Sequence, residues 1–326
     1  MLVTACAWWL VTGHAAVATP RVHGAVIADD AADPKVVLDG NQFVAFTTST
    51  ASGNVPVWRS NDLEQWSFVH DAMPYLGRWA VPGATWSPTV VHTRLLQWVM
   101  FYVAHDQASG RECIGRAVAS RVTDVFHDDN SQPVVCQLEH GGSIDPEVLT
   151  DPATGALWMT WKTDDPAIGG SPEIWSAQLD GTATHFVSVP EPLIALDRDD
   201  EGPQIEGPVL AAAAGRYWLF YSANAWDTSD YHVNFAICDS PAGPCTKAPV
   251  PFIDKSSGVD GPGSMCLFTD AAGQSFVAFH GWVTAVGYDA GGSRGLFVER
   301  VTFEPDLAQL RPDLPRRGTP ALLPTP

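Results

Sequence analysis

The chain repeats one pattern: a short apolar strand that opens on a polar residue, a tight turn, and a second strand rich in aromatic residues. The clearest copy runs from Ile205 to Leu210 and from Gly215 to Ser222, with an Ala/Gly turn between, which indicates a β-hairpin. Four further copies are Asp33–Leu38 with Phe43–Phe46, Ser87–Val91 with Trp98–Tyr102, Asp145–Leu149 with Leu157–Trp161, and Gly261–Phe268 with Phe276–His280. The copies stand about 54 to 61 residues apart, a period typical of propellers. The pattern therefore predicts an all-β, five-bladed β-propeller.

The ends of the predicted propeller follow from the same pattern. Phe297–Phe303 is a last alternating strand, and we expect it to close the ring by completing a blade begun at the N-terminus, since closure removes exposed sheet edges. We predict that residues 19–312 form this single domain. Residues 313–326 are rich in proline and are expected to form a loose C-terminal tail.

Residues 1–18 have the pattern of a removable secretory signal peptide. Leu2–Val17 is mostly apolar, and Ala16-Val17-Ala18 before Thr19-Pro20 has the small-x-small form of a cleavage site. No Lys or Arg precedes the apolar run and His14 interrupts it, so the match is imperfect. The segment nevertheless predicts a secreted protein.

Cysteine usage agrees with export. Cys238 and Cys245 bracket a turn-containing segment that a disulfide can close, while Cys113 and Cys136 flank one strand-and-loop unit and form the next natural pair. Cys266 is left over on a predicted inner strand. These spacings match no zinc-ligand pattern, so the sequence predicts two disulfides and no metal site at the cysteines.

Composition and charge exclude several functions. The 326 residues include 28 Gly, 26 Pro and 13 Trp, which suits a turn-rich β-protein in which most Trp side chains pack between blades. A net charge of −19 argues against nucleic acid or an anionic membrane surface as partner. We expect a monomer. No phosphate-cradling glycine loop and no Gly-x-Ser-x-Gly turn is present, so neither a nucleotide cofactor nor a serine hydrolase is predicted.

In a propeller, the first strands of all blades line the central axis, so their equivalent positions converge. The positions we expect to be equivalent are Asp33, Ser87, Asp145, Glu206 and the Gly261 region. Asp before Pro is also a common turn former, and Glu before Gly-Pro is a poorer one. Three carboxylates recurring in register favour a shared acidic pocket over three separate turns.

These residues resemble glycoside hydrolase family 43, which folds as a five-bladed propeller. The matching motifs are Ala32-Asp33-Pro34, Trp86-Ser87-Pro88-Thr89-Val90, Ser143-Ile144-Asp145-Pro146, Ile205-Glu206-Gly207-Pro208 with Tyr217–Ser222, and Arg294 followed by Leu296–Arg300. Each motif alone is weak, but their order and spacing are specific, and together they cover about residues 30 to 305.

The resemblance implies that Asp33 is the general base, Glu206 the general acid, and Asp145 the residue that tunes the acid's pKa and orients it. Inverting glycoside hydrolysis needs one carboxylate to activate water and one protonated carboxyl for the leaving oxygen, roughly 6.5–9.5 Å apart. Glu201 lies in a similar Glu-Gly-Pro tripeptide and is the rival acid. We favour Glu206 because only it leads directly into the strand–turn–aromatic unit.

The predicted sugar-binding residues are Trp86, Arg294, His280, Trp226 and Trp282. Trp86 and Trp282 are candidates for stacking on sugar faces, Trp226 and Tyr231 for shaping an outer subsite, and Arg294 faces the pocket in the family. His280 has two interpretations, a pocket ligand or a satisfied core histidine.

The chain departs from the family after Gly261-Pro262-Gly263. Many family members have a His there, often tied to a central calcium ion or water network, whereas this chain has Ser264 and Met265. His280 is the only nearby substitute. We therefore predict no cofactor, and a structural calcium ion on the axis stays unpredicted.

The sequence thus predicts an inverting glycoside hydrolase of α-L-arabinofuranosyl or β-D-xylosyl linkages in plant polysaccharides or their oligosaccharides. The alternative is a non-catalytic, carbohydrate-binding propeller, favoured by the Ser264-Met265 departure and opposed by the three carboxylates. A propeller for protein interaction is the remaining class. The choice between arabinose and xylose, and between exo and endo action, stays open.

Overall fold

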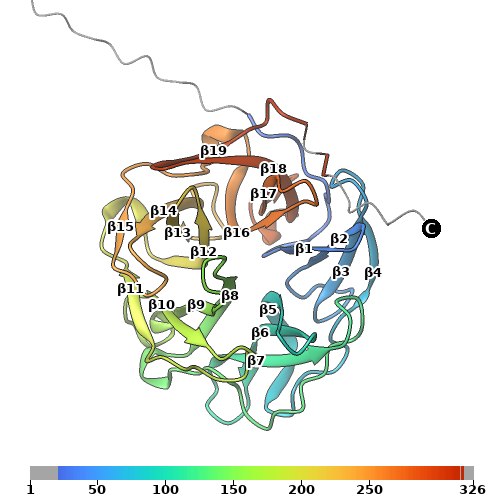
Figure 1. The fold of residues 1–326 in the computed structure, drawn as a ribbon, viewed down its shortest axis with the longest axis vertical. Helices are drawn as coiled ribbons and strands as arrows, with labels where there is room; N and C mark the ends of the chain where they lie inside the picture. Colours follow the sequence, from blue (N-terminus) through green and yellow to red (C-terminus); the bar gives the residue numbers. More distant parts are fainter. Residues whose placement is uncertain (1–20, 316, 319–326) are drawn as a thin grey trace, which may run out of the picture.

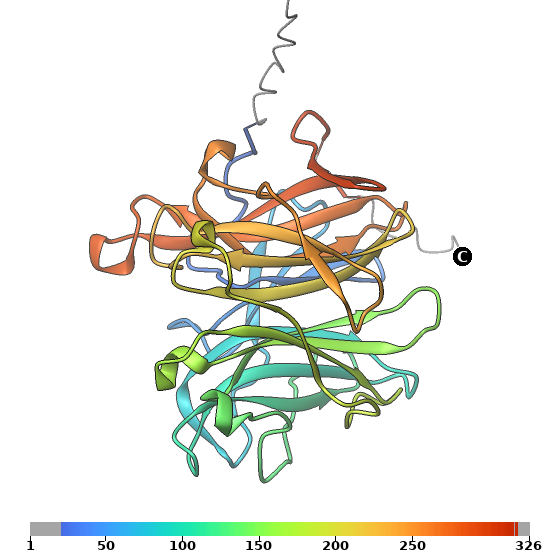
Figure 2. The ribbon, with the colours of Figure 1, turned by 90° about the vertical axis from the view of Figure 1, so that its left-hand side faces the viewer.

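Five antiparallel β-sheets form a ring around a central axis in the computed structural model, which describes residues 21–315, 317 and 318 (Figure 1). Seen from the side, the strands run roughly along that axis (Figure 2). The predicted all-β, five-bladed propeller is confirmed. The predicted signal peptide, residues 1–18, lies outside the described residues, and so does most of the predicted tail, residues 313–326.

Each blade is built from strands that follow one another in the chain. Blade one comprises β1 (Lys35–Asp39), β2 (Gln42–Phe46), β3 (Pro56–Ser60) and β4 (Ser67–Asp71). Blade two comprises β5 (Ala80–His92), β6 (Trp98–Asp106) and β7 (Glu112–Ala119). Blade three comprises β8 (Ser143–Thr150), β9 (Leu157–Thr163), β10 (Glu173–Leu179) and β11 (Glu191–Ala195). Blade four comprises β12 (Ile205–Ala213), β13 (Arg216–Ala223), β14 (His232–Cys238) and β15 (Cys245–Lys247). Blade five comprises β16 (Asp260–Thr269), β17 (Ser275–Val283), β18 (Ser293–Glu304) and β19 (Leu307–Leu310). One-turn 3-10 helices lie in the loops at η1 (Leu138–His140), η2 (Asp165–Ile168), η3 (Asp199–Glu201), η4 (Lys255–Ser257) and η5 (Tyr288–Ala290).

The five predicted hairpins form the inner half of every blade. They are the antiparallel pairs β1–β2, β5–β6, β8–β9, β12–β13 and β16–β17. In the first of them Asp39 pairs with Gln42 across a two-residue turn whose Gly40 has φ 57°, a conformation that costs glycine little. Local turn chemistry and apolar strands therefore specify these units without long-range information.

A left-handed residue recurs near the axis in every blade. These residues are Asp33 (φ 51°), Ser87 (44°), Asp145 (54°), Gly207 (56°) and Ser264 (42°). In blades two to five the pairing of the first strand with the second shifts register at this point, as a β-bulge does when it re-aims a side chain. Gly enters the left-handed region freely and Asp more readily than most residues, so the choice of residue here is partly a backbone requirement.

This bulge corrects the equivalence expected from the sequence. Gly207, and not Glu206, occupies the position of Asp33 and Asp145, and Ser264 occupies it in blade five in place of the Gly261 region. The positive φ selects the residue before Pro in blades one to four, which places Glu206 one residue earlier. Its side chain consequently leaves the strand in another direction from those of the two aspartates.

Ring closure also differs from the expectation. The predicted last strand, Phe297–Phe303, lies within β18, the third strand of a blade whose other strands are all C-terminal, so none of the described blades combines strands from both ends of the chain. The N-terminal segment instead lies on the edge of β18 that β19 leaves free: Ile27 bridges to Leu296, and the Ala31 N–H donates to the Arg294 carbonyl at 2.8 Å. This strap joins the two ends of the chain.

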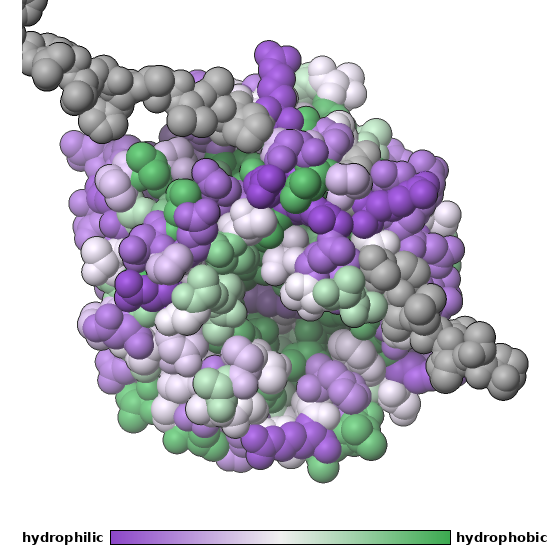
Figure 3. Space-filling model, turned by 45° about the horizontal axis from the view of Figure 1, so that its top comes forward, coloured by the Kyte–Doolittle hydropathy of each residue, from purple (hydrophilic) through white to green (hydrophobic). Residues whose placement is uncertain are grey.

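The blades pack through apolar side chains, and several Trp residues serve this packing as expected. Trp161 and Trp218 are fully buried. Hydrophilic residues cover much of the face shown in Figure 3, which is hollowed near its centre. No helix within residues 21–315 is long and apolar enough to cross a membrane.

The cysteines pair as the spacing predicted. Cys113 in β7 is bonded to Cys136 in the loop before β8, and Cys238–Cys245 closes the β14–β15 hairpin. Cys266 is free and buried in β16. Burial raises the pKa of its thiol to about 12, so it is inert at neutral pH.

Candidate active site

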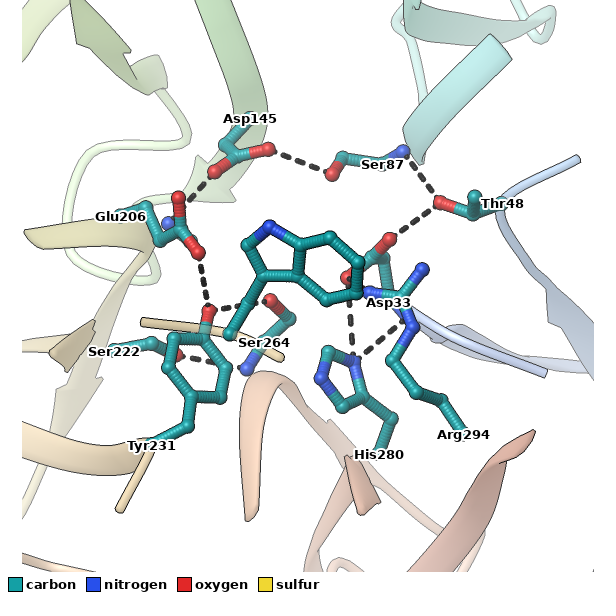
Figure 4. A network of polar contacts seen from close by, with 12 residues as sticks. Asp33, Thr48, Ser87, Asp145, Glu206, Ser222, Tyr231, Ser264, His280 and Arg294 are labelled. Carbon is teal, nitrogen blue, oxygen red and sulfur yellow. Dashed lines mark hydrogen bonds and ion pairs between the residues drawn. The ribbon is translucent and has the colours of Figure 1, made fainter. Parts of the chain in front are cut away.

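A pocket of about 560 Å³ lies where the left-handed residues of the blades approach the axis. It brings together the three predicted carboxylates, Asp33, Asp145 and Glu206. Its wall also contains three of the five predicted sugar-binding residues, Trp86, Trp226 and Arg294. Side chains from different blades thus meet in one cavity (Figure 4).

Asp33, at the entrance to β1, is held as a carboxylate. Thr48 donates to its Oδ2 at 2.5 Å, and the guanidinium of Arg294 lies 3.7 Å from Oδ1. Nδ1 of His280 lies 3.2 Å from the Asp33 backbone nitrogen and from Oδ1. Burial alone would raise the pKa of Asp33, but Arg294, His280 and Thr48 outweigh it and hold that pKa well below its usual range. Asp33 is therefore ionised and aimed, as a base must be.

Asp145 occupies the same backbone position in blade three but has a different environment. Its Oδ1 accepts from the Ser87 hydroxyl at 2.7 Å, and its Oδ2 from the Gly207 N–H at 2.9 Å. Burial, followed by repulsion from Glu206, raises the pKa of Asp145 to about 6, although Lys162 opposes the shift. Asp145 therefore retains a proton next to Glu206 at mildly acidic pH.

Glu206 is buried in β12, and both its oxygens are contacted. The Tyr231 hydroxyl donates to Oε1 at 2.8 Å, and Nζ of Lys162 lies 3.2 Å from Oε2. Tyr231 was expected to shape an outer subsite, but its side chain is fully buried and lies over Gly263, where a Cβ would come within 1.9 Å of the phenol ring. Glycine at position 263 is thus required for the contact between Tyr231 and Glu206.

Hydrogen bonds connect Asp33 to Asp145 through two residues between them (Figure 4). Thr48 Oγ1 accepts from the Ser87 N–H at 3.0 Å while donating its own proton to Asp33. The Ser87 hydroxyl in turn donates to Asp145. Because an amide proton forms one link, this chain orients the carboxylates but does not carry protons between them.

Aromatic rings surround Arg294 at one side of the pocket. Its guanidinium carbon lies 4.9 Å from the ring centroid of Trp226, and its Nε donates to the Tyr288 hydroxyl at 2.9 Å. The Tyr288 hydroxyl also contacts Asp30. Trp226 is 36% exposed and available to a ligand, whereas Trp282 is 5% exposed, does not line the pocket and packs behind Trp226. Trp282 therefore supports the ring of Trp226, and it does not line the pocket as a predicted sugar contact would.

His280 and Glu201 also lie outside the pocket wall. His280 is completely buried and contacts Asp33, so it supports the base and does not reach a ligand. Glu201, the rival acid, is completely buried between Lys247 at 2.7 Å and the Tyr221 hydroxyl at 2.8 Å. The buried ion pair with Lys247 accounts for a glutamate at position 201 without a catalytic role.

The site does not fit a protein-ligated axial calcium ion. Nε2 of His280 is buried without a hydrogen-bond partner in the described chain. However, residues 21–315 contain no group of three His, Cys, Asp or Glu side chains that could hold a metal ion. We derive no step through a metal.

The sequence analysis missed Lys162, Thr48, Tyr288 and Asp30. Lys162 is the one charged residue in the otherwise largely apolar strand β9, Leu157–Thr163. This feature of the sequence could have identified it as a candidate site residue. The other three lie in loops, where no periodicity marks them.

A propeller with three carboxylates in an axial pocket has the architecture of an enzyme that cleaves carbohydrates. The chain matches the family described as glycosyl hydrolases family 43 over residues 23–307, and it belongs to that family. It is a glycoside hydrolase. The sequence resemblance is thereby confirmed.

Relatives of this chain carry several activities. β-D-galactofuranosidase xynD of Aspergillus niger is 22% identical over 271 residues, which cover 76% of this chain and 73% of that protein. A solved thermostable family-43 glycoside hydrolase superposes with TM-score 0.76 at 23% identity, covering 94% of this chain and 98% of that one. An exo-1,5-α-L-arabinanase from a bovine ruminal metagenomic library superposes with TM-score 0.70 at 20% identity, covering 89% and 99%. These structural likenesses establish the fold.

Proposed function

We propose that this chain is an inverting glycosidase that cleaves α-L-arabinofuranosyl or β-D-xylosyl linkages in plant polysaccharides or their oligosaccharides. One observation carries the proposal: an ionised Asp33 shares a single pocket with Glu206 and with Asp145, whose raised pKa keeps a proton beside Glu206 at mildly acidic pH. Opposed protonation states of this kind are what acid–base hydrolysis requires.

The proposed reaction balances with water as the only co-reactant. Asp33 accepts a proton from a water molecule while the water oxygen bonds to the anomeric carbon, and Glu206 gives its proton to the glycosidic oxygen as that bond breaks. The products are a sugar of inverted anomeric configuration and an alcohol. Solvent then removes the proton from Asp33 and returns one to Glu206. Arg294 and Trp226 are suited to hold the sugar against Asp33.

A β-D-galactofuranosyl linkage is a second candidate, because the similar Aspergillus niger protein bears that activity in its name. The non-catalytic, carbohydrate-binding alternative has less support, since binding alone does not call for an ionised Asp33 and a proton-retaining Asp145 in one pocket. We further propose that the protein is secreted, because two disulfides suit an oxidising compartment.

Sugar release from a substrate panel tests this proposal. The panel comprises arabinan, arabinoxylan, xylan and the aryl α-L-arabinofuranoside, β-D-xyloside and β-D-galactofuranoside, with the product anomer followed by proton NMR. We expect pentose release with inversion. Retention of configuration would contradict the mechanism, release of galactofuranose alone would move the substrate to the second candidate, and binding without release would favour the carbohydrate-binding alternative.

The pH dependence has a predictable sign. Asp145, beside Glu206, holds a proton below a pH of about 6 and loses it above, and the proposed reaction consumes a proton at the leaving group. Asp33 stays ionised to a lower pH than an ordinary aspartate. We therefore expect kcat/KM to fall tenfold per unit as pH rises beyond about 6, with no matching fall until pH drops below about 4. Initial rates between pH 3 and 9 measure this, and a constant kcat/KM between pH 5 and 8 would contradict it.

A further inference from the structure

Lys162 is a buried cation on the wall of the catalytic pocket. It lies in β9, the second strand of blade three, and its side chain is 3% exposed. Nζ lies 3.2 Å from Oε2 of Glu206 and is the only cation in the described chain within 4 Å of that carboxylate. The same carboxylate accepts from Tyr231 through its other oxygen. Both oxygens of the Glu206 carboxylate are thus contacted, one by a phenol and one by an ammonium group.

A buried ammonium group is costly, and packing alone does not require one, since an apolar residue of similar volume fills such a position at less cost. The charges around Lys162 account for it. Its pKa is raised despite burial, because Glu206, Asp145 and Asp164 surround it. The titratable groups facing this cluster come from four further segments: Glu112 and Arg111 at β7, Tyr231 before β14, Asp33 before β1, and His280 on β17. Lys162 supplies positive charge among the carboxyl groups of Glu206, Asp145 and Asp164.

A cation beside a general acid has a cost for catalysis. It favours the ionised carboxylate, whereas the acid must be protonated to act. Retention of Lys162 at this place therefore needs a benefit, and the geometry supplies one. With Tyr231, the ammonium group fixes the plane of the Glu206 carboxyl, which has to present a proton along the direction of the breaking bond.

We propose that Lys162 is a positioning residue for the general acid: its ammonium group, 3.2 Å from Oε2, orients the Glu206 carboxyl. This inference rests on the proposed function of Glu206. It predicts an enzyme adapted to mildly acidic conditions. Lys162 orients the Glu206 carboxyl, and its positive charge reduces activity at neutral pH.

The test is Lys162→Met, with Lys162→Gln as a second uncharged variant should the first not fold. Lys162 lowers the pKa of Asp145, so removing the cation favours retention of the proton beside Glu206, and the alkaline limb of the kcat/KM profile is expected to move upward by about one pH unit. At the optimum, kcat/KM on an oligosaccharide is expected to fall about 100-fold, because the acid is no longer aligned. On an aryl glycoside with a good leaving group, which needs little protonation, the fall is expected to be below about tenfold.

Lys247→Met is the matched control. Lys247 forms the same kind of buried pair with Glu201, at 2.7 Å in blade four, outside the pocket. We expect this variant to lose thermal stability while keeping the alkaline limb and the leaving-group dependence of the wild type. Lys162→Arg, which keeps the charge, is expected to retain the wild-type limb.

Two results would overturn the inference. One is an alkaline limb of Lys162→Met that coincides with that of the wild type. The other is an equal loss of kcat/KM on both substrates, which would indicate a general structural role. A wild-type protein without activity on any glycoside would instead remove the proposed function itself, so the two failures are distinguishable.

Discussion

Asp33→Asn is expected to lower kcat on every glycoside substrate by about 10³-fold, the scale of a general base. The amide keeps the shape of the side chain and still accepts the hydrogen bond from Thr48, but it cannot take a proton from water. The effect should be independent of the leaving group, because the base acts on the attacking water in every case. Steady-state kinetics on an aryl glycoside and on an oligosaccharide measure this.

Asp71→Asn provides the control for the same change in the same blade. Asp71 lies at the end of β4 and accepts backbone N–H groups from Asn54, Val55 and Met73, outside the pocket. We expect it to reduce the melting temperature without changing kcat. If Asp33→Asn retained more than about a tenth of wild-type kcat, the role of base would pass to another residue.

Glu206→Gln is expected to show the second large effect, and this one should depend on the leaving group. Glutamine keeps a contact with Tyr231 but has no proton to give. On oligosaccharides, whose leaving alcohols need protonation, we expect kcat to fall about 10³-fold or more. On aryl glycosides with good leaving groups the loss should be smaller by at least tenfold. A comparison of kcat across a series of aryl leaving groups checks this, since the variant should show a steeper dependence on leaving-group acidity than the wild type.

Glu201→Gln is the matched control for the acid. Glu201 shares a Glu-Gly-Pro tripeptide and a lysine partner with Glu206 but lies outside the pocket. It should keep wild-type kinetics and lose stability, because Lys247 loses a charged partner at 2.7 Å. Loss of activity in Glu201→Gln, together with normal activity in Glu206→Gln, would reverse the assignment.

The sequence was sufficient to predict what local chemistry determines. Each blade starts with a hairpin whose strands and turn can be predicted from a few neighbouring residues, so the number of blades could be predicted by counting these hairpins in the sequence. Asp33 and Asp145 were found for the same reason: both precede Pro at a recurring position whose backbone is left-handed. The pairing of Cys238 with Cys245 depends on one turn and was equally local.

The parts that could not be predicted depend on contacts between blades. Nothing near Trp282 or His280 in the chain shows that one packs behind Trp226 and the other behind Asp33. Lys162 stands out in its strand, but its partner Glu206 lies in the next blade, and pattern alone does not connect them. Glu206 was wrongly aligned with Asp33 and Asp145 for a further reason: counting repeats along the sequence does not reveal a bulge of one residue.

The strap of residues 22–31 on β18 makes the charge environment of Asp33 depend on a residue far along the chain. Asp33 emerges from the ribosome early, and Arg294, which keeps it ionised, emerges almost last. The strap brings the two together, through Ala31 bonded to the Arg294 carbonyl and Arg294 N–H bonded to Asp30 at 3.1 Å. A nascent or truncated chain that lacks blade five therefore holds every other catalytic carboxylate and yet has an untuned base. Glycosidase activity is therefore expected only once blade five has closed the ring.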